Sequence, residues 1–247
     1  MTPASRSPFD RPAFWVLIFY AALYLLSASG RMSSGDATGQ LQATLLLRHT
    51  GRLSSPTPFI RYLWLKSPTG VYYEIHDIGA VGAMFPAALL GSAISTASEH
   101  DQIASPSLPT RLAVAFTYCL IGALGPFFLY RLFALFYSAR TAFLVSLFFG
   151  VCTMYWPYTK TARDVLPGCV CVCAMLFYAG RLALNAFSPP ATAITPTLRQ
   201  NALSLGIATG LALAFRVSLA PFLLLGIAGL LVALFRRLPR SVALHVA

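Results

Sequence analysis

Long apolar stretches recur along the chain and are separated by short polar segments. A helix that crosses the hydrocarbon core of a bilayer needs roughly 20 mostly apolar residues. The apolar stretches therefore predict an all-α polytopic membrane protein in which residues 1–247 form a single transmembrane domain. The six expected spans cover residues 13–30, 112–130, 141–158, 165–180, 201–215 and 217–235.

The division between the last two spans depends on Arg216. This residue interrupts residues 201–235, which otherwise carry no charge. One helix of that length would extend about 52 Å at 1.5 Å per residue, which is longer than a bilayer is thick. Arg216 is therefore expected to mark the turn of a helical hairpin.

Residues 31–111 are rich in polar residues and are expected to form a long loop that contains amphipathic or re-entrant helices. Residues 78–96 are apolar but contain three glycines and a proline, which makes it ambiguous whether they cross the membrane. Whether this segment crosses decides the orientation of every span that follows it. If they do not span, nine arginines lie on the cytoplasmic side and only three basic residues lie in the short outer loops. If they do span, the cytoplasmic count falls to six. The positive-inside rule favours the first arrangement, with both chain ends cytoplasmic in the inner (cytoplasmic) membrane.

A cleaved signal peptide is the alternative interpretation of residues 13–30. The five further apolar stretches favour a retained first helix.

The composition supports a membrane protein. The chain is 57% hydrophobic and 10% charged, whereas a soluble domain carries about 25% charged residues. This excludes a soluble enzyme, a coiled coil and a disordered protein. The net charge of +11 does not indicate nucleic-acid binding, because the basic residues are scattered between apolar stretches as interfacial anchors.

The five cysteines lie within apolar stretches, and Cys169, Cys171 and Cys173 alternate with valines. On a helix this spacing turns them to different faces, and no histidine lies nearby in the sequence. They are interpreted as small buried apolar residues, and no metal ligands are assigned.

The predicted topology places all acidic residues except Asp10 on the outer side, together with several cations. Carboxylates and cations at one interface are suited to general base catalysis and to holding an anionic lipid head group. The candidate residues are Asp36, Glu74, His76, Asp77, Lys160, Arg163, Asp164 and Arg216.

Each candidate also has a structural interpretation. Asp36 precedes a probable helix with Leu41 and Leu45 on one side and can act as its N-cap. The segment from Glu74 to Asp77 can be a solvated turn. Residues 160–164 can be interfacial anchors that contain an Arg–Asp pair.

Five motifs in order along the chain resemble the GT-C superfamily of polytopic membrane glycosyltransferases, which includes protein O-mannosyltransferases and lipid A aminoarabinose transferases. The first span ends in S-G-R-M-S-S-G-D, and an H-T-G-R-L segment follows. An aromatic and glycine-rich stretch, the segment W-P-Y-T-K-T-A-R-D-V-L-P and a span–Arg–span junction complete the resemblance. The motifs occupy Ser29–Asp36, His49–Leu53, Thr69–Gly91, Trp156–Pro167 and Gly210–Pro221.

The resemblance implies transfer of a sugar from a polyprenyl-phosphate donor to an acceptor at the outer face of the membrane. By position, Asp36 takes the role of the family's catalytic base. The cations Lys160, Arg163 and Arg216 would hold the departing lipid phosphate. Glu74, His76 and Asp77 would orient acceptor or sugar, or help to hold a divalent cation if one is used.

Family members are usually longer, so the resemblance leaves open a short member, a truncated product or one part of a split enzyme with a partner subunit. Two other classes of function remain: a transporter or flippase of an anionic or lipid-linked substrate, and a non-catalytic membrane partner. The catalytic hypothesis predicts that the Arg216 guanidinium faces the bundle interior and pairs with Asp36 or Asp164.

Overall fold

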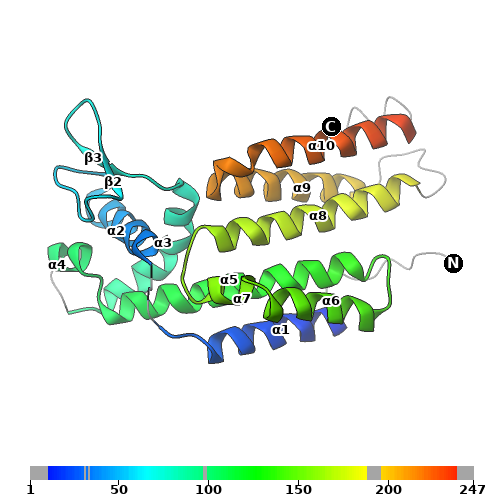
Figure 1. Cartoon of the computed structure of the whole chain (residues 1–247), viewed down its shortest axis with the longest axis horizontal. Helices are drawn as coiled ribbons and strands as arrows, with labels where there is room; N and C mark the ends of the chain where they lie inside the picture. The colour runs from blue at the N-terminus through cyan, green and yellow to red at the C-terminus, as the bar shows by residue number, and fades with distance from the viewer. Residues whose placement is uncertain (1–10, 31, 33, 97–98, 188–195, 238–247) are drawn as a thin grey trace. The chain divides into compact units, whose positions relative to one another are not determined.

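A computed structural model of the chain describes residues 11–30, 32, 34–96, 99–187 and 196–237, and the protein is mostly helical (Figure 1). The chain divides into two compact units. The first, here called the bundle unit, comprises Met1–Tyr20, Leu124–Val151 and Gly168–Ala247. The second, here called the mixed unit, comprises Ala21–Ala123 and Cys152–Pro167.

The bundle unit is built from long apolar helices. Four of its helices, α1, α5, α6 and α8, include residues of both units, α6 by its last residue only. The elements are α1 (Arg11–Leu26), α5 (Leu108–Phe133), α6 (Ala139–Cys152), α8 (Val165–Phe187), α9 (Pro196–Phe215), the 3₁₀ turn η1 (Val217–Leu219) and α10 (Ala220–Arg237).

The core of the bundle unit is held together by small apolar side chains and by uncharged contacts. Cys171 of α8, Ala212 of α9 and Leu223 of α10 are buried in one apolar cluster, so the sequence-based interpretation of this cysteine as a small packing residue is confirmed. Elsewhere in the unit, the hydroxyl oxygens of Tyr20 and Ser146 lie 3.1 Å apart and join α1 to α6.

The mixed unit combines short helices with a small antiparallel sheet whose strand order is β1-β3-β2. In the register of the sheet, Leu65 pairs with Tyr73 and Ser55 pairs with Tyr72. The sheet lies in the segment where only helices were expected. The elements are α2 (Gly35–Thr50), β1 (Ser54–Ser55), β2 (Trp64–Lys66), β3 (Tyr72–Glu74), α3 (Ile78–Ala93), α4 (Glu99–Ala104) and α7 (Tyr155–Thr159).

Helix α2 is buried along most of its length, and a row of small residues lets the chain around the sheet approach it closely. Gly35, Gly39 and Ala43 are spaced four residues apart and therefore share one face of the helix. A Cβ atom at Gly39 would lie 3.0 Å from Leu63 Cδ1 and 3.5 Å from Glu74 Oε1. The glycine thus leaves room for the Leu63 side chain against α2, and the Glu74 carboxylate lies next to the same position.

Helix α3 packs on the rest of the mixed unit through one face and leaves large apolar side chains on the other. Ala80 and Met84 are fully buried, whereas Ile78 and Leu90 are more than 60% exposed. Near its end, a Cβ atom at Gly91 would lie 2.8 Å from Thr110 N and 2.9 Å from Pro109 O, so this helix meets the start of α5 at backbone contact.

Within the described residues, two helices are long and apolar enough to cross a membrane, Leu108–Phe133 and Val165–Asn185. They correspond to the second and fourth expected spans. Four shorter apolar helices accompany them, at Arg11–Leu26, Ile78–Ala93, Ala139–Cys152 and Val217–Val232. A membrane association therefore has weak support from the structure, and the six-span topology stays a prediction.

The structure corrects the third expected span and confirms the break at Arg216. Residues 141–158 were expected as one helix, but α6 ends at Cys152 and α7 begins at Tyr155. The Thr153 hydroxyl accepts the Tyr155 N–H at 3.1 Å, which gives that amide a local partner in place of a helical one. Arg216 itself adopts an extended conformation between α9 and η1.

Candidate functional site

The first candidate residue, Asp36, lies in the first turn of α2 but does not cap it. Ser34 is the N-cap, and its Oγ accepts the Ala37 N–H at 3.2 Å. The expected capping role of Asp36 is therefore wrong, because the serine two residues earlier already satisfies the free amide. The carboxylate is left available for partners outside the helix, and its side chain is 27% exposed.

Arg163 is the cation that binds Asp36. Its Nη2 donates to Asp36 Oδ2 at 2.5 Å, although the two residues lie 127 positions apart in the sequence. The residue before it, Ala162, has a φ of +52° and is almost fully buried. A left-handed alanine is strained, and this turn aims the following arginine at the start of α2.

Glu74 and His76 form the other side of the cluster. The Glu74 carboxylate accepts the backbone N–H of His76 at 2.9 Å through Oε2, and its Oε1 contacts His76 Nδ1. The second ring nitrogen, Nε2, lies 3.8 Å from Asp36 Oδ1. The His76 ring is thus oriented by Glu74 so that its far side faces Asp36.

The Glu74 carboxyl is almost entirely removed from solvent, with 4% of its side chain exposed. This burial raises the pKa of Glu74 above its usual value, while its hydrogen bond and charge interaction with His76 lower the pKa and Asp164 raises it. Because Asp164 is 6% exposed, a second buried carboxyl lies within electrostatic reach of Glu74.

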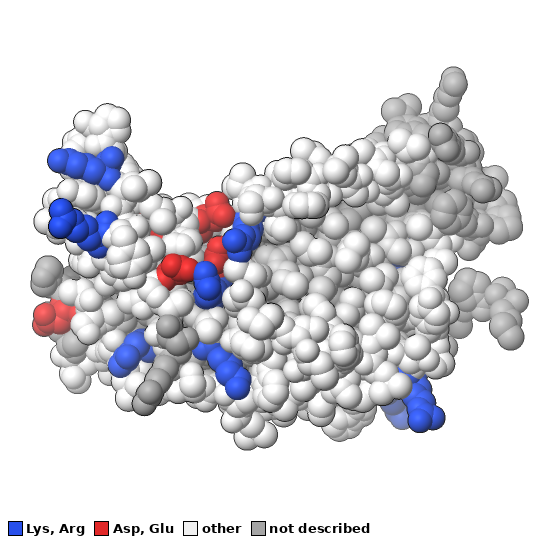
Figure 2. Space-filling view, in the orientation of Figure 1, with Lys and Arg blue, Asp and Glu red and all other residues white. Residues whose placement is uncertain are grey.

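Four of the sequence-predicted residues therefore come together in the mixed unit as one polar cluster. Here the name "acid–histidine cluster" denotes Asp36, Glu74, His76 and Arg163. On the face drawn in Figure 2, acidic side chains lie next to basic ones, as expected for such a cluster. The functional roles assigned to these residues stay predictions.

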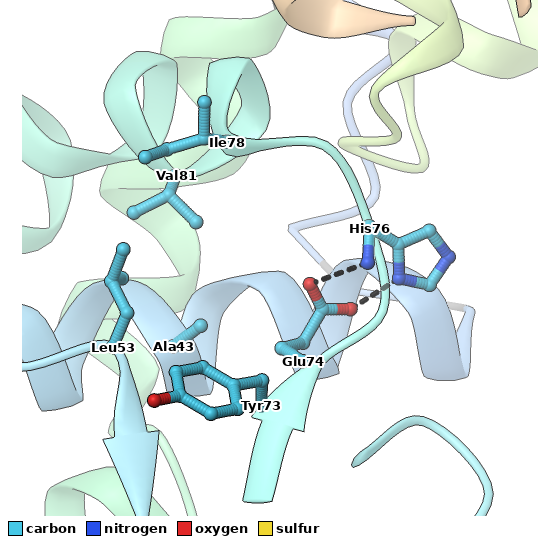
Figure 3. A pocket seen from close by; sticks show the side chains of 7 residues that line it. All are labelled: Ala43, Leu53, Tyr73, Glu74, His76, Ile78 and Val81. Carbon is cyan, nitrogen blue, oxygen red and sulfur yellow. Dashed lines mark hydrogen bonds and ion pairs between the residues drawn. The ribbon is translucent and has the colours of Figure 1, made fainter. Parts of the chain in front are cut away.

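A small pocket of about 100 Å³ lies behind Glu74. Ala43, Leu53 and Tyr73 contribute to its mainly apolar lining (Figure 3). Glu74 and His76 also line it, and the figure shows the two joined by the contacts described above. The pocket therefore borders the acid–histidine cluster.

The remaining candidates in the mixed unit have other positions. Asp77 precedes α3 in an extended conformation, and its side chain makes no capping hydrogen bond with that helix. Lys160 Nζ lies 4.7 Å from the centre of the Trp156 ring, a distance typical of a cation–π contact. Trp156 Nε1 in turn donates to Ser27 Oγ at 3.0 Å, which ties α7 to the chain after α1.

Arg216 belongs to the bundle unit. Its backbone N–H donates to Ala212 O at 2.9 Å, and its Nε lies 3.4 Å from Ser218 Oγ. The expected pairing of its guanidinium with Asp36 or Asp164 stays a prediction.

Two residues near the cluster were not among the sequence candidates. Gln40 lies one turn after Asp36, is fully buried, and neither polar atom of its side chain has a hydrogen-bond partner among the described residues. Gly39 lies on α2 next to the Glu74 carboxylate. The spacing of Asp36, Gln40 and Thr44 at intervals of four residues could have revealed a buried polar row on this helix.

The cluster does not fit a divalent cation. Among the described residues, no three His, Cys, Asp or Glu side chains are arranged to hold a metal ion. In addition, the Arg163 guanidinium already occupies one oxygen of Asp36. The charge of that carboxylate is therefore balanced by a side chain of the protein itself.

Comparisons of the chain with models of known protein families, with curated proteins and with solved structures gave no match.

Proposed function

We propose that the protein is a membrane glycosyltransferase that moves a sugar from a polyprenyl-phosphate donor to an acceptor hydroxyl at the outer face of the inner membrane. The observation that carries this proposal is the geometry of Asp36. Its carboxylate is partly exposed, one oxygen is paired with Arg163, and the other faces His76. The resemblance of the motifs around these residues to GT-C glycosyltransferases supports the same function.

The two oxygens of Asp36 suit different tasks. Oδ2 is held by the guanidinium of Arg163, which orients the carboxylate. Among the described residues, the nearest charged or titratable partner of Oδ1 is His76 Nε2 at 3.8 Å, and Oδ1 is therefore the oxygen that can accept a proton from a bound hydroxyl. A base held in this way is oriented before the substrate arrives.

In the proposed reaction the acceptor oxygen attacks the anomeric carbon of the sugar. The bond from that carbon to the phosphate oxygen breaks, and its electron pair remains on the phosphate of the departing polyprenyl phosphate. Asp36 takes the proton of the acceptor hydroxyl. Arg163, which is partly exposed, is suited to the departing phosphate because a guanidinium offers several N–H donors in a fixed plane. Lys160, in the same unit, adds a second positive charge in this proposal.

The proposed topology has six spans with both ends cytoplasmic, so that the mixed unit faces outward. Its support is the alternation of apolar helices with polar connections and the two helices of membrane-crossing length. Large apolar side chains on the described helices, among them Phe116, Leu176 and Phe222, are more than 40% exposed, as lipid-facing residues would be.

The test is the substitution Asp36→Asn in the full chain. The variant retains size and polarity but cannot accept a proton, so we expect transfer to fall by about 10²- to 10⁴-fold. The measurement is release of polyprenyl phosphate from polyprenyl-phosphate mannose and polyprenyl-phosphate aminoarabinose in membranes that contain the protein. Asp101→Asn, at an exposed acid of α4 outside the cluster, is the matched control. Wild-type rates in the Asp36→Asn variant would exclude Asp36 as the base.

A further inference from the structure

The acid–histidine cluster contains Glu74 and His76, which would not be needed if Asp36 acted as a base alone. Glu74 is buried against Gly39 of α2 and uses both carboxylate oxygens on one residue, His76. A buried carboxylate that contacts a histidine ring nitrogen selects the tautomer with the proton on that nitrogen. In this arrangement Nδ1 carries the proton and Nε2 presents its lone pair toward Asp36.

The distance between His76 Nε2 and Asp36 Oδ1 indicates that a hydroxyl group can bind between them. At 3.8 Å it exceeds the length of a hydrogen bond. In the tautomer selected by Glu74, Nε2 and the ionised carboxylate are both hydrogen-bond acceptors, so neither can donate to the other. A hydroxyl oxygen placed between them can lie within hydrogen-bonding distance of both.

We propose, resting on the glycosyl transfer proposed above, that Asp36 and His76 act as one base and that Glu74 is the positioning residue that makes this possible. The acceptor hydroxyl binds between Asp36 Oδ1 and His76 Nε2. Asp36 accepts its proton while the acceptor oxygen forms the new bond to the anomeric carbon, and the proton then passes to His76 Nε2. The resulting imidazolium lies between the carboxylates of Glu74 and Asp36, and Asp36 is again ionised. His76, whose side chain is 18% exposed, then releases the proton from Nε2 to water, so that both groups are ready for the next cycle.

The charges around His76 favour this final state. Glu74 faces one ring nitrogen and Asp36 faces the other. Asp164 lies within electrostatic reach of Glu74 and adds a further negative charge. Arg163 is the opposing charge, and it is bound to the oxygen of Asp36 that does not face the ring.

The substitution that tests the relay is Glu74→Gln. The amide has nearly the same shape but no negative charge, so the imidazolium loses one of its two stabilising carboxylates. We expect kcat to fall by about ten- to a hundredfold, with KM changed little. We also expect the acid limb of the pH–rate profile to move to lower pH, because protonation of His76 becomes less favourable. A merely structural role of Glu74 would lower the amount of folded protein without moving this limb.

A second measurement reports on the ring without any substrate. The chain has four histidines, so nitrogen-labelled histidine in the full protein in detergent micelles gives few imidazole signals, and the His76→Gln variant assigns the one from His76. We expect a neutral ring protonated at Nδ1 in the wild type and in the Asp101→Asn control, and loss of this preference in Glu74→Gln. A wild-type ring protonated at Nε2 would overturn the relay.

The outcomes separate the two proposals. If polyprenyl phosphate is released by the wild type and Glu74→Gln leaves both kcat and the acid limb unchanged, the relay is excluded and the glycosyl transfer stands. If the wild type releases no polyprenyl phosphate from either donor, the proposed function is overturned and the relay falls with it, whatever the tautomer of His76. Reduced kcat together with a shifted acid limb and an Nδ1-protonated ring supports the relay.

Discussion

The two units of the molecule are both built largely from helices, but they use charge in opposite ways. Every acidic residue in the described part of the chain lies in the mixed unit. The described part of the bundle unit contains only basic residues as charged groups, and Arg131 lies 4.5 Å from the centre of the Phe177 ring. One of its internal polar contacts joins two uncharged hydroxyl groups, those of Tyr20 and Ser146.

This difference shows how a largely apolar chain can gather its reactive polar side chains in one unit. In the described part of the bundle unit, no acidic residue is present to pair with a buried cation. In the mixed unit, the glycine row on α2 and the short strands bring four charged or titratable side chains close enough to balance one another. The following predictions test this contrast, in order of decreasing effect.

The largest effect is expected from removing the cation of the cluster. Arg163→Gln leaves Asp36 without its strongest partner and takes a charge from the proposed phosphate site, so transfer from polyprenyl-phosphate mannose should fall by about 10²-fold. Arg163→Lys should recover part of the activity, because it restores the charge but not the planar donor group. The exposed Arg61 of the same unit provides the control substitution Arg61→Gln. Equal activity of Arg163→Gln and Arg61→Gln would contradict the prediction.

The next effect concerns packing within the mixed unit and compares two glycines of one helix. Gly91→Ala places a methyl group against the backbone of Thr110 and should destabilise the protein by about 1–3 kcal/mol. Gly82→Ala meets no atom within 4 Å and should stabilise the helix by roughly 0.5–1 kcal/mol. Heat-induced unfolding in detergent measures both changes. A lower midpoint for Gly82→Ala than for Gly91→Ala would show that the α3–α5 contact is not close.

A smaller effect is expected from pH. Because burial raises the pKa of Glu74, the folded state binds this proton more tightly than the unfolded state does. The corresponding stability is present below the ordinary pKa of a glutamate and is lost as the pH rises through the raised value. The unfolding midpoint of the wild type relative to Glu74→Gln should therefore decrease as the pH is raised from 4 to about 7. A difference that stays constant over this range would mean that the carboxyl is not buried in solution.

The smallest effect is expected in the bundle unit. Tyr20→Phe removes one hydroxyl that contacts Ser146 and should reduce stability by about 1 kcal/mol. Transfer activity should remain at the wild-type level, because the hydroxyl lies in the unit whose described residues include no acid. Unfolding in detergent and the transfer assay report the two quantities separately, and a large loss of activity in a folded variant would break the contrast between the units.

The sequence predicts the helices better than it predicts the site. The charge-free stretches on either side of Arg216 predict a helix break that the structure confirms, because chain length and bilayer thickness allow few alternatives. The small sheet was missed, since its strands have two or three residues and show no periodicity. The break after Cys152 was missed because the segment is apolar on both sides of it.

The partners within the cluster could not be derived from the sequence for a physical reason. Arg163 was expected either to pair with its neighbour Asp164 or to bind a phosphate, and only the turn at Ala162 directs it to Asp36. Likewise, the approach of Glu74 to α2 depends on the fold of the strand that carries it, which the sequence does not reveal. Both effects depend on backbone geometry between segments that are distant in the sequence.

The left-handed turn at Ala162 also restricts which sequences this protein can accept during evolution. Glycine would relieve the backbone and fit the space, whereas a β-branched residue would suffer both from the positive φ and from the lack of room around a side chain that is 1% exposed. We therefore expect only alanine and glycine to be tolerated at this position. A library that randomises this codon and selects only for folded protein should recover those two residues, even though neither carries any chemistry of its own.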